Sequence, residues 1–355
     1  MSGEPHLGDI ERDVKNAFQV ISGHRAKAMR EAEERLRQIE LIPFRIPDGS
    51  AEIVAIDGSY APLFRAGSIW IVAVRAAALT YEFSEGDGYA IKACDVNEAA
   101  HLITTDRAVA SQVGGFTGEL QSLTARGRSR SEAPGRMARY ARILCELQLA
   151  AWVAGQRSKT TIVLDGTLTV PPPITIKRKM EETIEACERN GNALVGVSKD
   201  SEVSLFGGLV GDEELLKQVK REGLLYAVPP APRRTTLGPR GTTYFVRYHP
   251  EAPKWFRTDI ISPNCEPDEL FGRLAQFARS QLCLGYIYPL ADAHRAAVEL
   301  RKFSKLYDDL LFKVAAETGL NAEDIVWGRT NIEGRRRDAF HAYLDFVSKT
   351  GAGKR

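Results

Sequence analysis

Residues 160–199, TTIVLDGTLTVPPPITIKRKMEETIEACERNGNALVGVSK, alternate between strand-like and helical patterns. The first residues, TTIVLDGT, and the last, NALVGVSK, are apolar runs typical of buried strands. Between them a helical pattern begins at Ile174 and stops at Gly191, a residue that commonly ends helices. Strand, helix and strand in this order favour at least one pair of parallel strands. The stretch therefore predicts an α/β fold class.

Strand-like and helical patterns extend on both sides of this stretch. Upstream, AEIVAIDGS (51–59) predicts a short strand that stops at Asp57, and SIWIVAVRAAALTYEF (68–83) predicts a neighbouring strand reached by a turn around 61–67. Short strands are also expected at 243–248 and 255–260. Helical spacing of apolar residues predicts helices over 8–42, 97–123, 134–156, 267–284 and 291–319, with a short extended piece, GYIYPL, at 285–290.

Three segments describe the expected domain organisation. Residues 1–48 form an N-terminal helical segment, and 49–330 form the main α/β domain. Within that domain, 206–262 is rich in Pro and Gly and is expected to be a β-rich or loop insertion. Residues 331–355 are expected to form a C-terminal helix and a basic tail.

Composition excludes several classes of protein. The 355 residues contain 48 Lys and Arg against 46 Asp and Glu, a formal charge of +2, which rules out a polybasic binder but leaves room for a local basic groove. The five cysteines form no CxxC pair and indicate buried thiols in a reducing compartment. The polar N-terminus lacks a secretory h-region, and the apolar stretch 69–79 is broken by Arg75. We therefore expect a cytoplasmic protein without a membrane segment.

Polar residues follow three of the expected strands directly. They are Asp57 in IDGS, Asp165 in LDGT and Lys199 in VSKD. Ligands collect at the carboxyl ends of strands in open α/β sheets, so these side chains are candidates for one site. Two carboxylates close together are costly unless a cation neutralises them, and a metal site is the natural interpretation.

Two further segments contribute candidate ligands. Glu146 lies among apolar residues of the 134–156 helix, where a carboxylate needs a metal or a salt bridge; Arg142 and Arg139 are the alternative partners. In GYIYPLADAHRAA (285–297), His294 stands near tyrosines and Asp292 at the start of a helical pattern, as a candidate ligand or proton carrier.

Four motifs in this order resemble the NurA nuclease family. They are AIDGS, the spacing from Glu146 to VLDGT, VGVSKDS and GYIYPLADAH, and the resemblance runs from about Ile53 to Ala296. It implies an RNase H-like fold, a mixed sheet flanked by helices. It also implies a metal-dependent 5′-to-3′ nuclease acting on single- and double-stranded DNA, generally with Mn²⁺. Such nucleases are typically dimeric and work with the HerA hexameric DNA translocase in DNA end resection.

The resemblance assigns roles to six positions of this chain. It implies that Asp57, Glu146, Asp165 and His294 are metal ligands, and that Lys199 is the family's lysine. The family tyrosine corresponds to Tyr286 or Tyr288, with Tyr286 favoured by its spacing from His294.

Phosphodiester hydrolysis agrees with these residue types. Carboxylates from two strands and one helix can hold two divalent ions about 4 Å apart, which stabilise the phosphoryl charge and activate water. Oxygen ligands with one imidazole favour Mn²⁺ or Mg²⁺ over Zn²⁺, and Lys199 could steady the attacking water or the developing charge. Arginines before and within the 134–156 helix offer phosphate contacts without sequence readout: Arg126, Arg128, Arg130, Arg136, Arg139 and Arg142.

Two other functions remain open at this point. An actin-like sugar kinase or ATPase also places D-G-S/T turns at strand ends, but its phosphate loops usually carry more glycines, and no late Gly-Gly adenosine loop follows here. The chain could instead be a non-catalytic helicase-binding subunit, although it retains all the polar positions. ATP binding would favour the first function, and metal-independent DNA binding without cleavage the second.

Overall fold

The computed structural model describes most of the chain up to residue 319 and divides it into two compact units. The described residues are 7–66, 68–84, 88–124, 133–169, 173–199, 206, 211–219, 221–229, 241–252, 254–261, 266–299 and 304–319. Unit 1 comprises Met1–Asp48, Gly196–Ile260 and Cys265–Tyr288; unit 2 comprises Gly49–Val195, Ile261–Asn264 and Pro289–Arg355. The boundary between them falls within β6 (Ala193–Ser198). The C-terminal helix and tail expected at 331–355 lie outside the described residues.

Unit 2 is built on a mixed sheet. The strands β2 (Ala51–Ala66), β3 (Ile69–Ser84) and β4 (Gly88–Thr104) are antiparallel neighbours, and β5 (Thr161–Asp165) pairs with β2 in parallel. Their order in space is β5-β2-β3-β4. Three antiparallel strands followed by a parallel strand beside the first one form the RNase H-like arrangement. The expected fold class is therefore confirmed.

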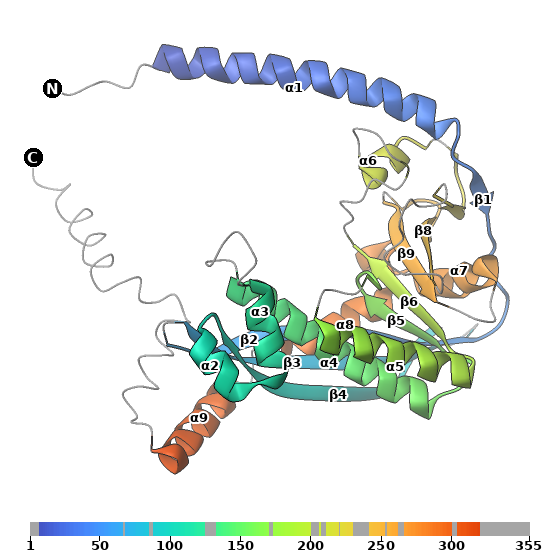
Figure 1. Ribbon diagram of the computed structural model, residues 1–355. Coiled ribbons are helices and arrows are strands. Elements are labelled where there is room, and N and C mark those ends of the chain that lie inside the picture. Colours follow the sequence, from blue (N-terminus) through green and yellow to red (C-terminus); the bar gives the residue numbers. More distant parts are fainter. Residues whose placement is uncertain are drawn as a thin grey trace, which may run out of the picture. The chain divides into compact units, whose positions relative to one another are not determined.

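Helices cover this sheet (Figure 1). Helix α4 (Ala133–Gln156) packs on β2, β3 and β4, and α5 (Ile174–Asn190) packs on α4. Met137 of α4 lies in a core cluster with Val72 and Ile103, and all three are almost fully buried. The unit also contains α2 (Arg107–Val113), α3 (Gly115–Thr124), α8 (Tyr288–Val298, from Pro289 onward) and α9 (Ser304–Thr318).

Unit 1 contributes four strands that pair antiparallel with one another. Its strands are β1 (Leu41–Pro43), β7 (Leu225–Ala227), β8 (Thr242–Arg247) and β9 (Phe256–Ile261), in that order in space. An aromatic cluster that includes Phe44, Tyr226 and Phe271 fills its core. The helical elements are α1 (Leu7–Leu36), α6 (Asp212–Leu216), α7 (Pro267–Gln276) and the 3₁₀ turn η2 (Gln281–Cys283).

Several predicted elements differ from the structure. The strand expected to stop at Asp57 continues to Ala66, because β3 pairs with it along its whole length. Residues 97–104 are strand because they pair with β3 along their whole length, despite good helix formers such as Glu98 and Ala99. The first helix ends at Leu36 because Leu41–Pro43 pairs with β7.

Near the C-terminus of the described chain, the elements are also shorter than expected. The helix predicted over 267–284 ends at Gln276, and the one predicted over 291–319 is divided into α8 and α9. The extended piece expected over 285–290 is cut short because α8 begins at Tyr288. None of the helices in the described ranges has the length and apolar character that crossing a membrane requires.

A buried asparagine joins the elements that lead into β5 and β6. Asn192 is fully buried; its Oδ1 accepts from Thr160 N–H at 2.9 Å, and its Nδ2 donates to the carbonyls of Ala154 at 3.1 Å and Arg157 at 2.9 Å. It therefore satisfies backbone groups at the end of α4 and the start of β5.

We predict that Asn192→Ala lowers the free energy of unfolding by about 2–4 kcal/mol, because Thr160 N–H and the Arg157 carbonyl lose a buried partner. Ser111→Ala, which removes an exposed hydroxyl bonded to Ala108 O, is the control and should change it by less than about 0.5 kcal/mol. Urea denaturation measures both. Equal changes in the free energy of unfolding for the two substitutions would show that Asn192 does not stabilise the connection between α4 and β5.

Candidate metal centre

Strand register brings two carboxylates to the same level of unit 2's sheet. In the parallel pair, Ile56 of β2 lies opposite Leu164 of β5, so Asp57 and Asp165 are the next residues on adjacent strands. The pairing with β5 ends there, while β2 continues beside β3 with Asp57 opposite Ala77. The sequence correctly placed Asp165 at a strand end, but Asp57 lies inside a strand.

Helix α8 adds an imidazole to this pair. His294 Nδ1 lies 2.6 Å from Asp57 Oδ2. One ligand atom from each of Asp57, Asp165 and His294 can be chosen so that all three lie within 4.8 Å of one another. Asp57 is buried, Asp165 is partly exposed and the His294 side chain is 51% exposed. The cluster therefore has a buried base and a side that solvent reaches.

Helix α4 supplies Glu146 and Arg142. The Arg142 guanidinium contacts Glu146 Oε1, four residues further along the helix, and lies 3.6 Å from Asp57 Oδ1. Glu146 was predicted either to bind a metal or to pair with an arginine, and in the structure it pairs with Arg142.

Gly58 leaves room for the Glu146 side chain of α4 beside Asp57. A Cβ built on Gly58 would lie 2.5 Å from Glu146 Oε1 and 2.8 Å from its Cγ, closer than side chains can pack. The Gly58 N–H also donates to Asp57 Oδ1 at 2.7 Å. The sequence indicated Gly58 only as part of a turn; a glycine inside a strand is the signal for close approach that could have identified it.

Burial and like charge disfavour the ionised form of the carboxyl groups in this cluster. Burial, and secondarily the charge of Asp165, raises the pKa of Asp57, although the bonds from His294 and Gly58 oppose this. Burial raises the pKa of Glu146 to about 8, against the lowering effect of Arg142. The neighbouring Glu146 carboxylate raises the pKa of Arg142.

The donor set fits a divalent cation. Two carboxylates and one imidazole, with a third carboxylate held by Arg142 beside them, provide oxygen-rich ligands of the kind Mn²⁺ and Mg²⁺ accept. A cation would offset both the desolvation and the mutual repulsion that raise the pKa of Asp57. Asp57, Asp165 and His294 are the residues that would hold it.

Two other predicted site residues lie together in unit 1. The Lys199 ammonium is 5.2 Å from the centre of the Tyr286 ring, which is buried and packs against Phe256. Tyr288, the alternative family tyrosine, is partly buried, and its N–H donates to Phe277 O. The contact with Lys199 makes Tyr286 the better candidate.

The predicted phosphate-binding arginines are divided by the structure. Arg136 and Arg139 are exposed on α4, whereas Arg142 is turned toward Asp57 and Glu146. Arg126, Arg128 and Arg130 lie outside the described residues.

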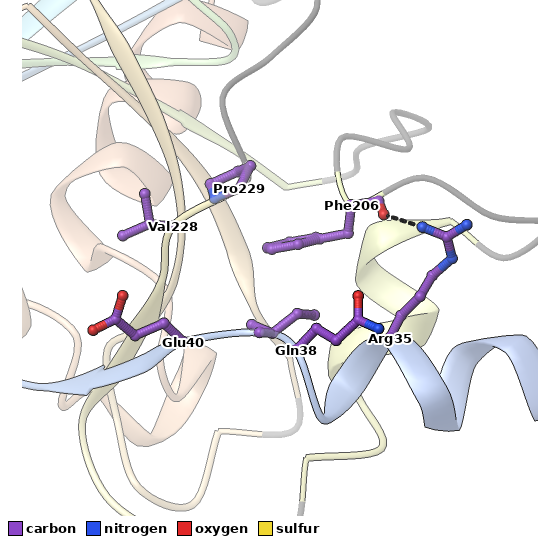
Figure 2. A pocket seen from close by; sticks show the side chains of 7 residues that line it. Arg35, Gln38, Glu40, Phe206, Val228 and Pro229 are labelled. Atoms are coloured by element: carbon purple, nitrogen blue, oxygen red, sulfur yellow. Dashed lines mark hydrogen bonds between the residues drawn. The ribbon is translucent and has the colours of Figure 1, made fainter.

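A cavity of about 410 Å³ lies in unit 1, and none of the described residues that line it is a predicted site residue (Figure 2). Arg35 donates from Nη1 to Phe206 O at 2.7 Å at its edge, and Val228 and Pro229 form part of its apolar wall. The described residues that line it include no cluster of metal-ligating side chains, so the cavity does not compete with the candidate metal centre.

We predict that Gly58→Ala weakens Mn²⁺ binding at least tenfold, because the new methyl group displaces Glu146 and disturbs its contact with Arg142. Gly155→Ala in α4 is the matched control, since nothing lies within 4 Å of its added Cβ, and it should raise stability by about 0.5–1 kcal/mol. Calorimetric titration with Mn²⁺ and thermal melting measure the two effects. Normal Mn²⁺ affinity in Gly58→Ala would contradict this packing argument.

The raised pKa of Glu146 predicts a pH-dependent stability of the metal-free protein. Its carboxyl binds a proton more tightly in the folded state than in the unfolded state, where the pKa is 4.5. The tighter proton binding adds to the free energy of unfolding. This contribution is fully present below about pH 4.5 and is lost as the pH rises toward 8. Metal-free protein should therefore melt at a lower temperature at pH 8 than at pH 6, and Glu146→Gln should reduce that difference. The prediction is wrong if the melting temperature rises from pH 6 to pH 8 by the same amount in the wild type and in Glu146→Gln.

Comparison with known proteins identifies the family of this chain. The crystal structure of the NurA nuclease from Sulfolobus solfataricus is similar, with a TM-score of 0.54 and 16% identity over 88% of this chain and 98% of that chain. A structure of NurA bound to dAMP and manganese has a TM-score of 0.48 and 12% identity, covering 83% and 94% of the two chains. The catalytic domain of human Endonuclease V has a TM-score of 0.38 and 12% identity, covering 81% and 98%.

No curated protein sequence matches the chain. The NurA domain family matches residues 51–299, which include Asp57, Glu146, Asp165 and His294, and the chain therefore belongs to the NurA family.

Proposed function

We propose that this NurA-family nuclease is a metal-dependent deoxyribonuclease that uses Mn²⁺, or Mg²⁺ in its place. The observation that carries the proposal is the convergence of Asp57, Asp165 and His294 within 4.8 Å, from segments far apart in the sequence. Carboxylate oxygens with one imidazole nitrogen support the choice of metal, because Zn²⁺ prefers Cys and several His ligands. A bound divalent ion supplies the charge stabilisation and water activation that phosphodiester hydrolysis requires.

The chain's own residues then have distinct tasks. Asp57 and Asp165 on the sheet and the half-exposed His294 would hold the ion, next to solvent from which a phosphate can approach. Arg142 neutralises part of the carboxylate charge and keeps Glu146 beside the site. We assign Lys199 and Tyr286 to the same reaction, with Lys199 stabilising phosphoryl charge and the Tyr286 ring positioning its ammonium.

DNA binding is assigned to arginines that precede and line α4. Arg136 and Arg139 are exposed on the helix that carries Glu146, so they can contact phosphates next to the cluster. Arg126 and Arg128, which precede this helix in the sequence, are assigned to DNA binding as well. Such contacts read charge and spacing rather than bases, which suits a nuclease without sequence preference.

The proposed biological role is DNA end processing. We assign 5′-to-3′ exonuclease activity, with endonuclease activity as a possible addition, on single- or double-stranded DNA, in partnership with a HerA-type hexameric translocase. A homodimer is part of this proposal and is supported by α1, where Ile10, Val14, Phe18 and Ile21 recur at helical spacing and are 44–65% exposed.

We predict that Asp57→Ala abolishes cleavage of linear DNA, with a loss of at least a thousandfold, without lowering the melting temperature of the metal-free protein. The catalytic loss follows from removal of a metal ligand, and the stability from relief of a buried carboxylate whose pKa is raised. DNA affinity and its dependence on salt should be nearly unchanged, because arginine–phosphate contacts provide them.

One preparation of each protein should be measured for nucleotide release, DNA binding and melting, with and without Mn²⁺. Asp106→Ala, which removes the exposed cap of α2, is a control that should cost stability but leave cleavage intact. Near wild-type cleavage by Asp57→Ala would remove Asp57 from the site. A wild type that cleaves no DNA with either metal would overturn the proposed function.

A further inference from the structure

A buried carboxyl group on α8 has no part in the proposed metal centre. Asp292 is 9% exposed and lies two residues before His294. Burying a carboxylate is costly unless it is well partnered. Its partners therefore indicate why an acid is present at this position.

Asp292 has one partner in the core and one at the surface. The Tyr81 hydroxyl donates to Asp292 Oδ2, and the Tyr81 side chain is 3% exposed. The Arg295 guanidinium contacts Asp292 from the same helix, but its side chain is 68% exposed. Water screens an exposed ion pair, so the buried bond from Tyr81 is the stronger constraint.

This bond attaches α8 to the same strands that carry the candidate metal centre. Tyr81 lies in β3 opposite Ile53, which is four residues before Asp57 in β2. Contact between Asp57 and His294 is the second attachment. The helix is thus attached to the β2–β3 hairpin through Asp292 and through His294, and the strand positions involved, at the levels of Ile53 and Asp57, are four residues or about 13 Å apart.

Helix geometry makes the first attachment relevant to the second. Side chains two residues apart in an α-helix are rotated by about 200° around its axis and so point to nearly opposite sides of the helix. His294 is half-exposed, and its ring contacts Asp57 through Nδ1. A fixed direction for Asp292 therefore sets the rotation of α8, and with it the direction of the His294 ring.

We propose that Tyr81 and Asp292 are positioning residues for the metal ligand His294. Their hydrogen bond holds the first turns of α8 in the rotation that brings the imidazole to Asp57 and Asp165. This inference rests on the proposed function, because it assumes that the cluster binds a divalent ion. Substitution of a residue that orients a metal ligand typically weakens metal binding by about 10–100-fold.

The test is Mn²⁺ binding to the full chain without DNA, measured by calorimetry or by the free Mn²⁺ signal in electron paramagnetic resonance. Tyr81→Phe, which removes only the hydroxyl, should weaken Mn²⁺ binding about tenfold. Cleavage by Tyr81→Phe should recover most of its maximal rate at saturating Mn²⁺, because the ligands themselves remain. His294→Ala should not recover in this way.

Tyr248→Phe is the matched control. Tyr248 is fully buried in unit 1, and its hydroxyl is hydrogen-bonded to Thr258 Oγ1 at 2.9 Å. Both variants lose one buried tyrosine hydroxyl, so their melting temperatures should fall by similar amounts. Only Tyr81→Phe should bind Mn²⁺ more weakly.

A second pair of variants tests the acceptor. Asp292→Ala should weaken Mn²⁺ binding at least as much as Tyr81→Phe, whereas Asp292→Asn keeps an oxygen that can accept from Tyr81 and should restore most of the affinity. Wild-type Mn²⁺ affinity in Tyr81→Phe, or equal losses in the Ala and Asn variants, would overturn the positioning role alone. A wild type that binds neither Mn²⁺ nor Mg²⁺ would overturn the proposed metal centre together with this inference.

Discussion

The parallel pairing of β2 with β5 is the constraint on which the candidate metal centre depends. Backbone hydrogen bonds between these strands set Ile56 opposite Leu164 and thereby place Asp57 and Asp165 side by side. Two carboxylates at this separation repel each other, and burial of Asp57 adds a desolvation cost. The sheet holds them together in spite of that cost, which a divalent cation would offset.

The two helices that complete the site act differently. Helix α4 packs across β2 and β3 and brings a neutralising pair, Arg142 and Glu146, to the buried side of Asp57. Within this pair it is the positive charge of Arg142 that moderates the repulsion, because it lowers the pKa of Asp57. Helix α8 brings His294 to the exposed side, where its contact with Asp57 leaves an open approach. Burial on one side and access on the other suit a site that must bind a charged polymer.

The sequence indicated most residues of the cluster but not the contacts that hold them in place. Asp165, Glu146 and His294 could be singled out because each has a local signature: a strand end, an acid in an apolar helix, and a histidine beside a helix start. The course of β2 beyond Asp57 could not, since D-G locally favours a turn and only the long pairing with β3 overrides it. The contacts of Gly58 with Glu146, and of Tyr81 with Asp292, join residues distant in the sequence and leave no periodic signal.

The central claim is that Asp57, Asp165 and His294 share one divalent ion. Electron spin-echo spectroscopy of Mn²⁺ bound to the metal-depleted protein tests it most directly, because a histidine nitrogen bound to Mn²⁺ modulates the echo. Wild-type protein should show that nitrogen modulation, and His294→Gln should lose it while still binding Mn²⁺ weakly through the two carboxylates. A wild type without nitrogen modulation, or a His294→Gln variant that retains it, would contradict the account.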